Sequence, residues 1–555
     1  MKKQGLLLGS AILVISAVLV KVLGAVFKIP LANMLGGTGM GYFSSAYGIF
    51  MPVYALTVTG IPAAISRYVA ENEAFESYSN IRRIKSVSLK LFSFIGLIAT
   101  LLILLLARPL CSSVIRSPDA LYAVLVIALS VLLGCVMAVY RGYYEGLRNM
   151  VPTAVSQLAE GLIKLPVGLL ACYAVLNLGS SNPTRFAELF CGGDVSRTEE
   201  LVLPIAAAAA VMGITAASLG GMLFLMLYSR VKGDGITYEA LRSDVVVQPT
   251  GEIVKCLAST LIPIAIGSLV TNLTSLIDLA TIIRCLEAAV GKAPSYFVKL
   301  SGGNDISEIP NFIYGSFMGL AVTIFNLVPS FINMLGKGAL PAVAQSCAEK
   351  DSDGTRRNIE SVLFVTAAAA LPCGLGITVL AEEILLLLFG GRPGEAAVSA
   401  DSLAVLGIAV VFLSISTPVF SMLQGIGRAD IPVKIMLAGV AVKLAGNLLL
   451  IPIVKINVSG AAIATLLCYI AIAILSLRSL RKHTGIAIGY AYIFAKPLYS
   501  GVLCAVTAFL TSSVLHRILS DSPAVCIAAI AAGGGVYLLS LYLLGGLSQL
   551  RDYLR

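Results

Sequence analysis

The chain has 555 residues, of which 58% are hydrophobic and 12% charged, and the charged fraction is about half that of an ordinary soluble protein. Uninterrupted apolar runs of about 20 residues recur along the chain, so lipid must be the solvent for most of its surface. The net charge of +10 comes without the interleaved aromatic patch that binds nucleic acid, so we expect no nucleic-acid partner and assign the excess Lys and Arg to loops facing an anionic leaflet.

Fourteen apolar segments are long enough to cross the bilayer as helices, and none alternates apolar and polar residues as a membrane strand does. The first follows Lys2 and Lys3, as a signal peptide would, but its apolar run continues past Lys21 to about Leu31 without a clear small-residue cleavage site, so we interpret it as an uncleaved span. The predicted spans lie near residues 6–33, 43–66, 91–107, 121–140, 152–176, 201–228, 257–283, 312–335, 361–380, 402–424, 431–453, 458–477, 497–515 and 523–546.

An even number of spans places both termini on one side of the membrane. Most of the 39 Lys and Arg residues fall in loops on that side. The positive-inside rule therefore predicts a multi-pass protein of the cytoplasmic membrane with both termini in the cytoplasm. None of the connecting loops is long enough to hold a soluble catalytic domain, which excludes most enzyme classes.

The sequence repeats itself faintly at a constant offset. The matched pairs, each 279 residues apart, are Pro62 and Pro341, Gly146 and Gly425, and Lys164 and Lys443. Six spans separate the copies, so the repeat is parallel and its pseudo-two-fold axis lies along the membrane normal. We predict an all-α integral membrane protein of about fourteen helices, with two six-helix lobes and two C-terminal helices. The predicted division is an N-lobe at 1–230, a cytoplasmic linker at 231–256, a C-lobe at 257–480, and spans 13 and 14 with the tail at 481–555.

Lysines inside the predicted spans are the strongest candidates for a binding site, because a charge at mid-bilayer must face protein, water or a partner. Lys164 and Lys443 both lie roughly 20 Å from the cytoplasmic ends of their spans at 1.5 Å per residue. The repeat predicts that they face each other between the lobes. Glu160 lies one turn before Lys164, so a purely structural ion pair is an open alternative there. Lys443 has no acid on its helix, and its polar neighbour at i+4 is Asn447.

Two more lysines lie on one face of the first span. Lys21 and Lys28 are seven residues apart. Lys28 is near the outer end, where its amine could extend to the interface, whereas Lys21 lies deeper. Buried cations in this number suit an anionic, phosphate-bearing substrate.

Acidic residues within the spans are fewer, and Asp278 and Glu160 are possible sites for a coupling ion or structural partners of lysines. We expect no cofactor beyond a coupling Na⁺ or H⁺. We also expect no metal site, because the eleven cysteines form no CxxC pair and His483 and His516 are the only histidines.

Six short motifs carry a resemblance to the multidrug/oligosaccharidyl-lipid/polysaccharide flippase superfamily. Two of them resemble the loop between spans 10 and 11 of that superfamily and its first-lobe counterpart, and two resemble the start of the stage V sporulation protein B branch and of the related lipid II flippases. The motifs are Gln424–Lys434, Gly146–Pro152, Lys21–Lys28, Leu35–Tyr42, Ser275–Asp278 and Leu387–Gly390.

The resemblance implies a flippase that moves an undecaprenyl-pyrophosphate-linked envelope precursor, a peptidoglycan or polysaccharide unit, by alternating access. It places Lys21 and Lys28 in the cavity, because proteins of this kind carry cavity-lining basic residues on span 1. Its partners would be a lipid-linked anionic saccharide and membrane lipid; we expect a monomer that could associate with envelope synthases. The lipid II flippases also carry a basic pair within span 2, whereas Tyr54–Gly60 carries no charge here.

Three alternatives remain open on the sequence alone. The first is a cation-coupled multidrug exporter of the same superfamily, which would need acids in its cavity. The second is a membrane enzyme, whose acids would lie on the outer loops 178–200 and 284–311. Those loops carry Glu188, Asp194, Asp305 and Glu308 in no recognisable motif. The third is a scaffold for envelope assembly that transports nothing.

Overall fold

A computed structural model describes residues 6–237, 241, 248–349, 351–519, 523–546 and 548–549. Within these ranges the regular structure is entirely helical, as predicted. In lipid the backbone amides and carbonyls have no water to bond, so each long apolar segment satisfies them within its own helix. Thirteen segments of the described chain are long and apolar enough to cross a membrane.

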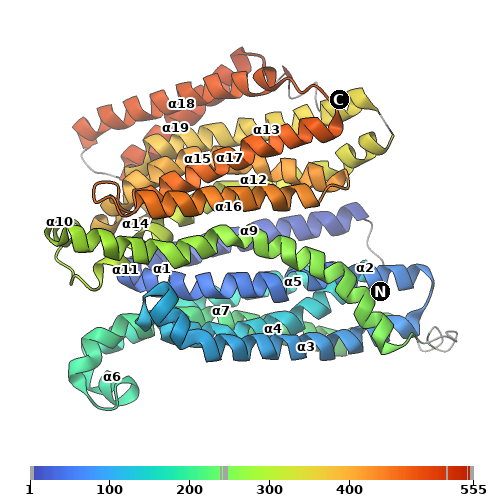
Figure 1. Cartoon of the computed structure of the whole chain (residues 1–555), viewed down its shortest axis with the longest axis horizontal. Coiled ribbons are helices and arrows are strands. Elements are labelled where there is room, and N and C mark those ends of the chain that lie inside the picture. The colour runs from blue at the N-terminus through green and yellow to red at the C-terminus, as the bar shows by residue number, and fades with distance from the viewer. Residues whose placement is uncertain are drawn as a thin grey trace. The chain divides into compact units, whose positions relative to one another are not determined.

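The difference between these thirteen segments and the fourteen predicted spans arises in α1 (Leu6–Thr57). One candidate segment, Ile12–Ala74, contains both of the first two predicted spans. Helix α1 is interrupted at Gly36, whose backbone angles (φ 64°, ψ −170°) are not helical. The Lys28 Nζ lies 5.9 Å from the centre of the Tyr47 ring, whereas a straight helix would separate these residues by roughly 28 Å. Helix α1 therefore folds back into two arms (Figure 1), and each arm corresponds to one predicted span.

Gly36 is the residue that permits this reversal, because its backbone conformation is essentially restricted to glycine. We expect Gly36→Ala to lower the free energy of unfolding by about 1–3 kcal/mol. The added Cβ would also lie 3.0 Å from Glu395 Oε1 and 3.1 Å from the Arg392 guanidinium carbon. Thermal unfolding in detergent measures the effect. Gly24→Ala is the matched control, since nothing lies within 4 Å of its added Cβ, and equal losses in the two variants would contradict this account.

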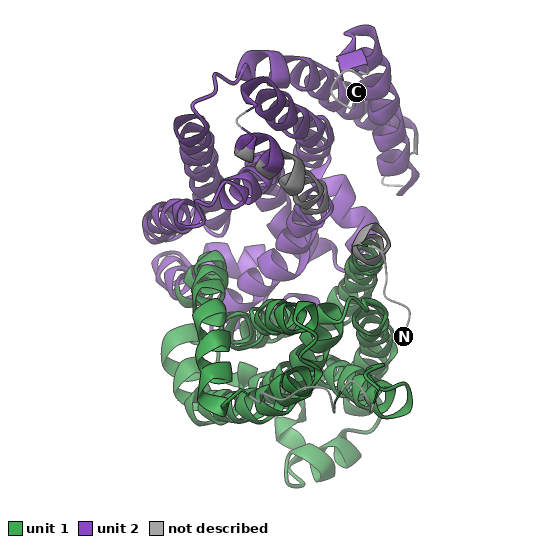
Figure 2. Cartoon of the chain, turned by 90° about the vertical axis from the view of Figure 1, so that its right-hand side faces the viewer, with its two compact units in different colours: residues 1–35, 39–280 green, residues 36–38, 281–555 purple. Residues whose placement is uncertain are grey.

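The described chain divides into two compact units, coloured separately in Figure 2. Unit 1 comprises residues 1–35 and 39–280, and unit 2 comprises residues 36–38 and 281–555. The boundary falls inside α9 (Thr250–Lys292). The sequence places the linker earlier, at 231–256, and its residues 238–240 and 242–247 lie outside the described part of the chain.

In unit 1, α4 packs against α2, α3 and α7, and α5 packs against α7. The α5–α7 contact is unusually close, because a Cβ on Gly213 would lie 2.5 Å from the Gly168 Cα. Small residues let the two backbones approach, as is common where membrane helices meet. The helices of this unit beyond α1 and α9 are α2 (Ile61–Ala74), α3 (Tyr78–Pro109), α4 (Leu121–Gly146), α5 (Val151–Ser181), α6 (Pro183–Phe190) and α7 (Thr198–Val231).

In unit 2, α15 lies at the centre and packs against α12, α13 and α17, while α16 packs on α17 and α18 on α19 and α13. Its helices beyond α9 are α10 (Pro294–Leu300), α11 (Ile309–Ser316), α12 (Val322–Ala348), α13 (Ser352–Val379), α14 (Ala381–Phe389), α15 (Pro393–Gly425), α16 (Asp430–Leu450), α17 (Ser459–Thr484), α18 (Tyr490–Leu519) and α19 (Pro523–Leu543). Predicted spans 13 and 14 correspond to α18 and α19. The predicted pseudo-two-fold between the lobes stays a prediction.

The two longest predicted loops contain short helices. Helix α6 lies within 178–200, and the loop 284–311 holds α10, the end of α9 and the start of α11. A third connection, after α7, is held to unit 1 by Asp234, which accepts hydrogen bonds from Arg82 Nε at 3.1 Å and Tyr143 Oη at 2.9 Å. Burial alone would raise the pKa of the Asp234 carboxyl, but bonds from Arg82, the Ile236 amide and Tyr143 outweigh it and hold the pKa below its ordinary value.

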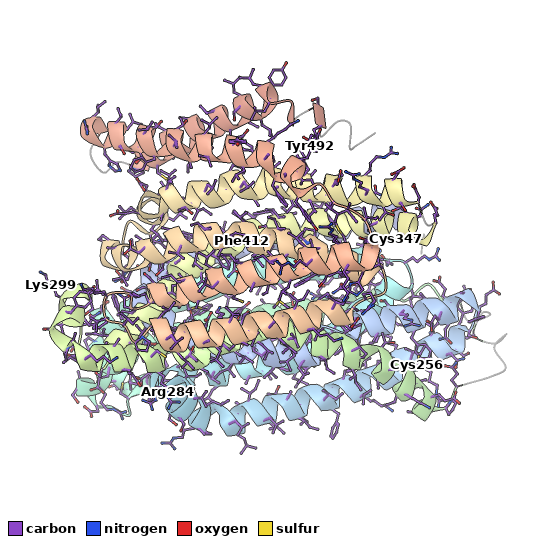
Figure 3. All side chains as sticks on the ribbon, turned by 45° about the horizontal axis from the view of Figure 1, so that its top comes forward. Cys256, Arg284, Lys299, Cys347, Phe412 and Tyr492 are labelled. Atoms are coloured by element: carbon purple, nitrogen blue, oxygen red, sulfur yellow. The ribbon has the colours of Figure 1, made fainter. Side chains whose placement is uncertain are left out.

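The eleven cysteines are free thiols scattered over both units, and Figure 3 labels Cys256 on α9 and Cys347 on α12. Within the described ranges, no three His, Cys, Asp or Glu side chains gather closely enough to hold a metal ion. Most of these cysteines are buried in apolar surroundings, where cysteine behaves as a small hydrophobic residue.

Candidate binding cavity

A cavity of about 280 Å³ lies within unit 1, between the two arms of α1 and helices α5 and α7. Its wall combines aromatic and charged side chains in an otherwise apolar bundle. The functional groups on the wall are Tyr47, Phe50 and Tyr54 from the second arm of α1, and Glu160 and Lys164 from α5. A largely apolar pocket with a few convergent polar groups is the usual form of a small-molecule site.

Two lysine amines lie over aromatic rings beside this cavity. The Lys164 Nζ is 4.5 Å from the centre of the Phe27 ring, and Lys28 lies over Tyr47. These cation–π contacts stabilise each ammonium group without neutralising it. The charges of Lys28 and Lys21 are close enough to repel the Lys164 ammonium, and Glu160 attracts it. The structure therefore gathers the three predicted lysines of the N-lobe into one electropositive region.

Glu160 forms its ion pair with Arg141 of α4, at 2.9 Å between Oε2 and Nη2. Arg141 also donates from Nε to the Ser156 Oγ at 2.9 Å, which fixes the guanidinium between α4 and α5. Within the described part of the chain, Lys164 takes part in no ion pair within 4 Å. The sequence left a structural ion pair between Glu160 and Lys164 as an open alternative. In the structure Glu160 pairs with Arg141 instead. Sequence analysis placed Arg141 in a loop, because the predicted span ends at residue 140.

Two glycines allow neighbouring helices to pack directly against the aromatic rings near the cavity. A Cβ on Gly168 of α5 would lie 2.7 Å from Phe27, and a Cβ on Gly134 of α4 would lie 2.6 Å from Tyr54. Neither ring can move toward these helices, because backbone fills the space behind it. Phe27 and Tyr54 are consequently held at the positions from which they face Lys164 and the cavity.

The second arm of α1 carries a row of aromatic side chains that was not predicted from the sequence. Phe43, Tyr47, Phe50 and Tyr54 follow one another at i, i+4, i+7 and i+11. Their successive ring centres are 6.2, 6.0 and 5.0 Å apart. The spacing was visible in the sequence, but an aromatic stripe at helical spacing is equally typical of ordinary packing.

The remaining predicted residues are distributed over both units. Lys21 is exposed and is not part of the cavity wall. Asp278 is buried on α9 in unit 1. Lys443 and Asn447 are buried on α16 in unit 2, where Asn447 Nδ2 donates to Thr281 Oγ1 at 2.9 Å. The predictions that Lys443 faces Lys164 and that Asp278 binds a coupling ion stay predictions.

Comparison with known proteins finds relatives that align with nearly the whole chain. Residues 6–182 match the family model described as polysaccharide biosynthesis protein, and residues 311–525 match that described as lipid II flippase MurJ. The chain is 24% identical to the lipid II flippase MurJ of Bacillus subtilis (strain 168), over 98% of this chain and 96% of that protein. It is 25% identical to the stage V sporulation protein B of the same organism, with the same coverage of both chains.

The chain also resembles solved structures of membrane transporters. The chain matches a lipid II flippase MurJ in an inward closed conformation with a TM-score of 0.66 and 13% identity, covering 99% of this chain and 100% of that one. It matches an inward-facing multidrug resistance MATE family transporter with a TM-score of 0.61 and 12% identity, covering 84% of this chain and 94% of that one. At these identities the structural likeness establishes the fold, and the resemblance predicted from the motifs is confirmed.

Proposed function

The chain is a membrane protein of the multidrug/oligosaccharidyl-lipid/polysaccharide flippase superfamily, and we propose that it moves an undecaprenyl-pyrophosphate-linked envelope precursor across the cytoplasmic membrane. The observation that carries this proposal is the group of Lys21, Lys28 and Lys164 in unit 1, where Lys164 forms no ion pair with any of the described residues. Ammonium groups form strong charge-assisted hydrogen bonds to pyrophosphate oxygens. The lipid II flippase MurJ among its sequence relatives supports this cargo class.

The proposed mechanism is alternating access, in which the two lobes rock about a central site. The cytoplasm-open state takes the pyrophosphate onto Lys21, Lys28 and Lys164, with Lys443 and Asn447 contributing from the second lobe, while the polyprenyl tail stays in lipid. Both termini lie in the cytoplasm, following the distribution of Lys and Arg. The protein works as a monomer beside envelope synthases and performs no covalent chemistry.

Reconstitution tests the function directly. Proteoliposomes carrying the purified protein and a fluorescent undecaprenyl-pyrophosphate saccharide would be treated with a membrane-impermeant quencher or lectin. We expect the protected inner-leaflet fraction to exchange in minutes with the protein and to stay protected in empty vesicles. Equal exchange in both preparations would contradict the proposal.

The second candidate is a cation-coupled drug exporter, in which the acids Glu160 and Asp278 would bind the coupling ion. Efflux of cationic dyes from the same vesicles, driven by an imposed Na⁺ or H⁺ gradient, would support it. We favour the flippase because Glu160 is already paired with Arg141 and the cavity retains an excess of lysine charge. Imposing each gradient during the flipping assay also tests whether either ion drives the flippase.

A further inference from the structure

The row of aromatic side chains in unit 1 extends along the wall of the cavity that holds Lys164. Tyr47, Phe50 and Tyr54 all line it, and the rise from residue 47 to 54 is roughly 10 Å. The ring centres of Phe50 and Tyr54 are only 5.0 Å apart. Three aromatic side chains therefore line this wall next to the Lys164 amine.

Such a surface has a defined chemical preference. An aromatic face carries partial negative charge, so it attracts the weakly positive C–H groups that line one face of a pyranose ring. A bare pyrophosphate would gain nothing from these rings, since their faces repel anions. The lysine amines and the aromatic row are thus suited to different parts of one headgroup.

From this arrangement we propose that Phe50 and Tyr54 form a sugar-stacking subsite, which binds the pyranose next to the pyrophosphate held by Lys164. The inference rests on the proposed flippase function and adds the part of the cargo that this wall recognises. Recognition through ring faces tolerates different hexoses, because every pyranose presents C–H groups.

The position of Tyr54 is set by its surroundings and not by the sugar. A Cβ added at Gly134 of α4 would lie 2.6 Å from the Tyr54 Cε2 atom, so the ring has no room to move toward α4. Glu160, on the same wall, presents its carboxylate near the ring and is anchored by Arg141. A fixed platform beside a fixed hydrogen-bond acceptor is pre-organised for a polyhydroxylated ring, which reduces the entropy lost on binding.

Two lipid probes separate this subsite from the phosphate site: undecaprenyl pyrophosphate, and the same lipid carrying one N-acetylhexosamine. Equilibrium binding to the purified protein would be measured for Phe50→Leu and Tyr54→Leu, which keep apolar volume but remove the ring face. We expect each variant to lose about tenfold in affinity for the sugar-bearing lipid, equivalent to about 1.4 kcal/mol, and to bind the bare lipid like wild type.

Matched variants give the controls. Tyr54→Phe keeps the ring and should recover most of the affinity for the sugar-bearing lipid that Tyr54→Leu loses. Tyr173→Leu removes an exposed aromatic residue of α5 outside the cavity and should bind both lipids like wild type. Equal losses for both lipids, or none for either, would overturn the subsite. If wild-type protein bound neither lipid, the proposed function itself would fail, which is a distinct outcome.

A tryptophan reporter keeps the test decisive even if the leucine variants fold poorly. The chain contains no tryptophan, so Phe50→Trp creates a single emitter in the aromatic row while keeping an aromatic face. Titration with the sugar-bearing lipid should shift and quench this emission more than titration with the bare lipid. Identical responses to the two lipids would also overturn the subsite.

Discussion

Replacing Lys164 with glutamine is expected to slow headgroup translocation about ten- to a hundredfold. A charge-assisted hydrogen bond to phosphate contributes roughly 1.5–3 kcal/mol, and glutamine keeps the length of the side chain but not its charge. The Phe27 ring beneath the amine stabilises a cation, so it offers no compensating interaction to an amide. The exchange assay in proteoliposomes measures the loss.

Two further variants make this result interpretable. Lys164→Arg retains the charge and should recover most of the rate, while Lys90→Gln removes an exposed lysine of α3 and should leave the rate unchanged. Thermal unfolding of all three variants should stay near that of wild type, because Lys164 makes no ion pair among the described residues. Wild-type translocation by Lys164→Gln would remove the central support for the pyrophosphate site.

The helices could be predicted largely because lipid makes their length and composition visible in the sequence. Fourteen apolar runs map onto the candidate spans, and the first two correspond to the arms of α1 on either side of Gly36. Hydropathy predicts the apolar part of a span and not the residue at which its helix ends. Helix α9 extends to Lys292, past the predicted end at 283, because polar residues outside the hydrocarbon core form helix as readily as loop.

The candidate site could be predicted only in part. Lys28 and Lys164 stand out in sequence because isolated charges in apolar runs need an explanation. Their aromatic partners are not predictable in the same way, since Tyr47 and Phe27 become neighbours of these amines only when α1 folds back and α5 packs on it. The Arg141–Glu160 pair joins two helices, and sequence spacing carries information only about partners on one helix.

Arg141→Leu is expected to lower the translocation rate about tenfold, although Arg141 contacts no part of the proposed cargo. Glu160 lies one turn before Lys164 in the favourable order for an i,i+4 pair, and Arg141 now holds its carboxylate. Removing Arg141 frees Glu160 to form an ion pair with Lys164. If this new pair is stable by about 1.4 kcal/mol, it competes with phosphate for Lys164 and lowers the phosphate affinity about tenfold.

The double variant Arg141→Leu/Glu160→Gln identifies the cause. If Arg141 acts by keeping Glu160 away from Lys164, neutralising Glu160 as well should restore translocation to within about twofold of wild type. A purely structural role predicts the opposite, because both halves of the half-buried pair are then lost. Thermal unfolding separates the two accounts: each single change leaves one charge unpaired and should lower stability by roughly 1–3 kcal/mol, whereas the double change removes both charges together. Restored stability without restored transport would contradict this account, because the protein would be folded and Glu160 could no longer neutralise Lys164.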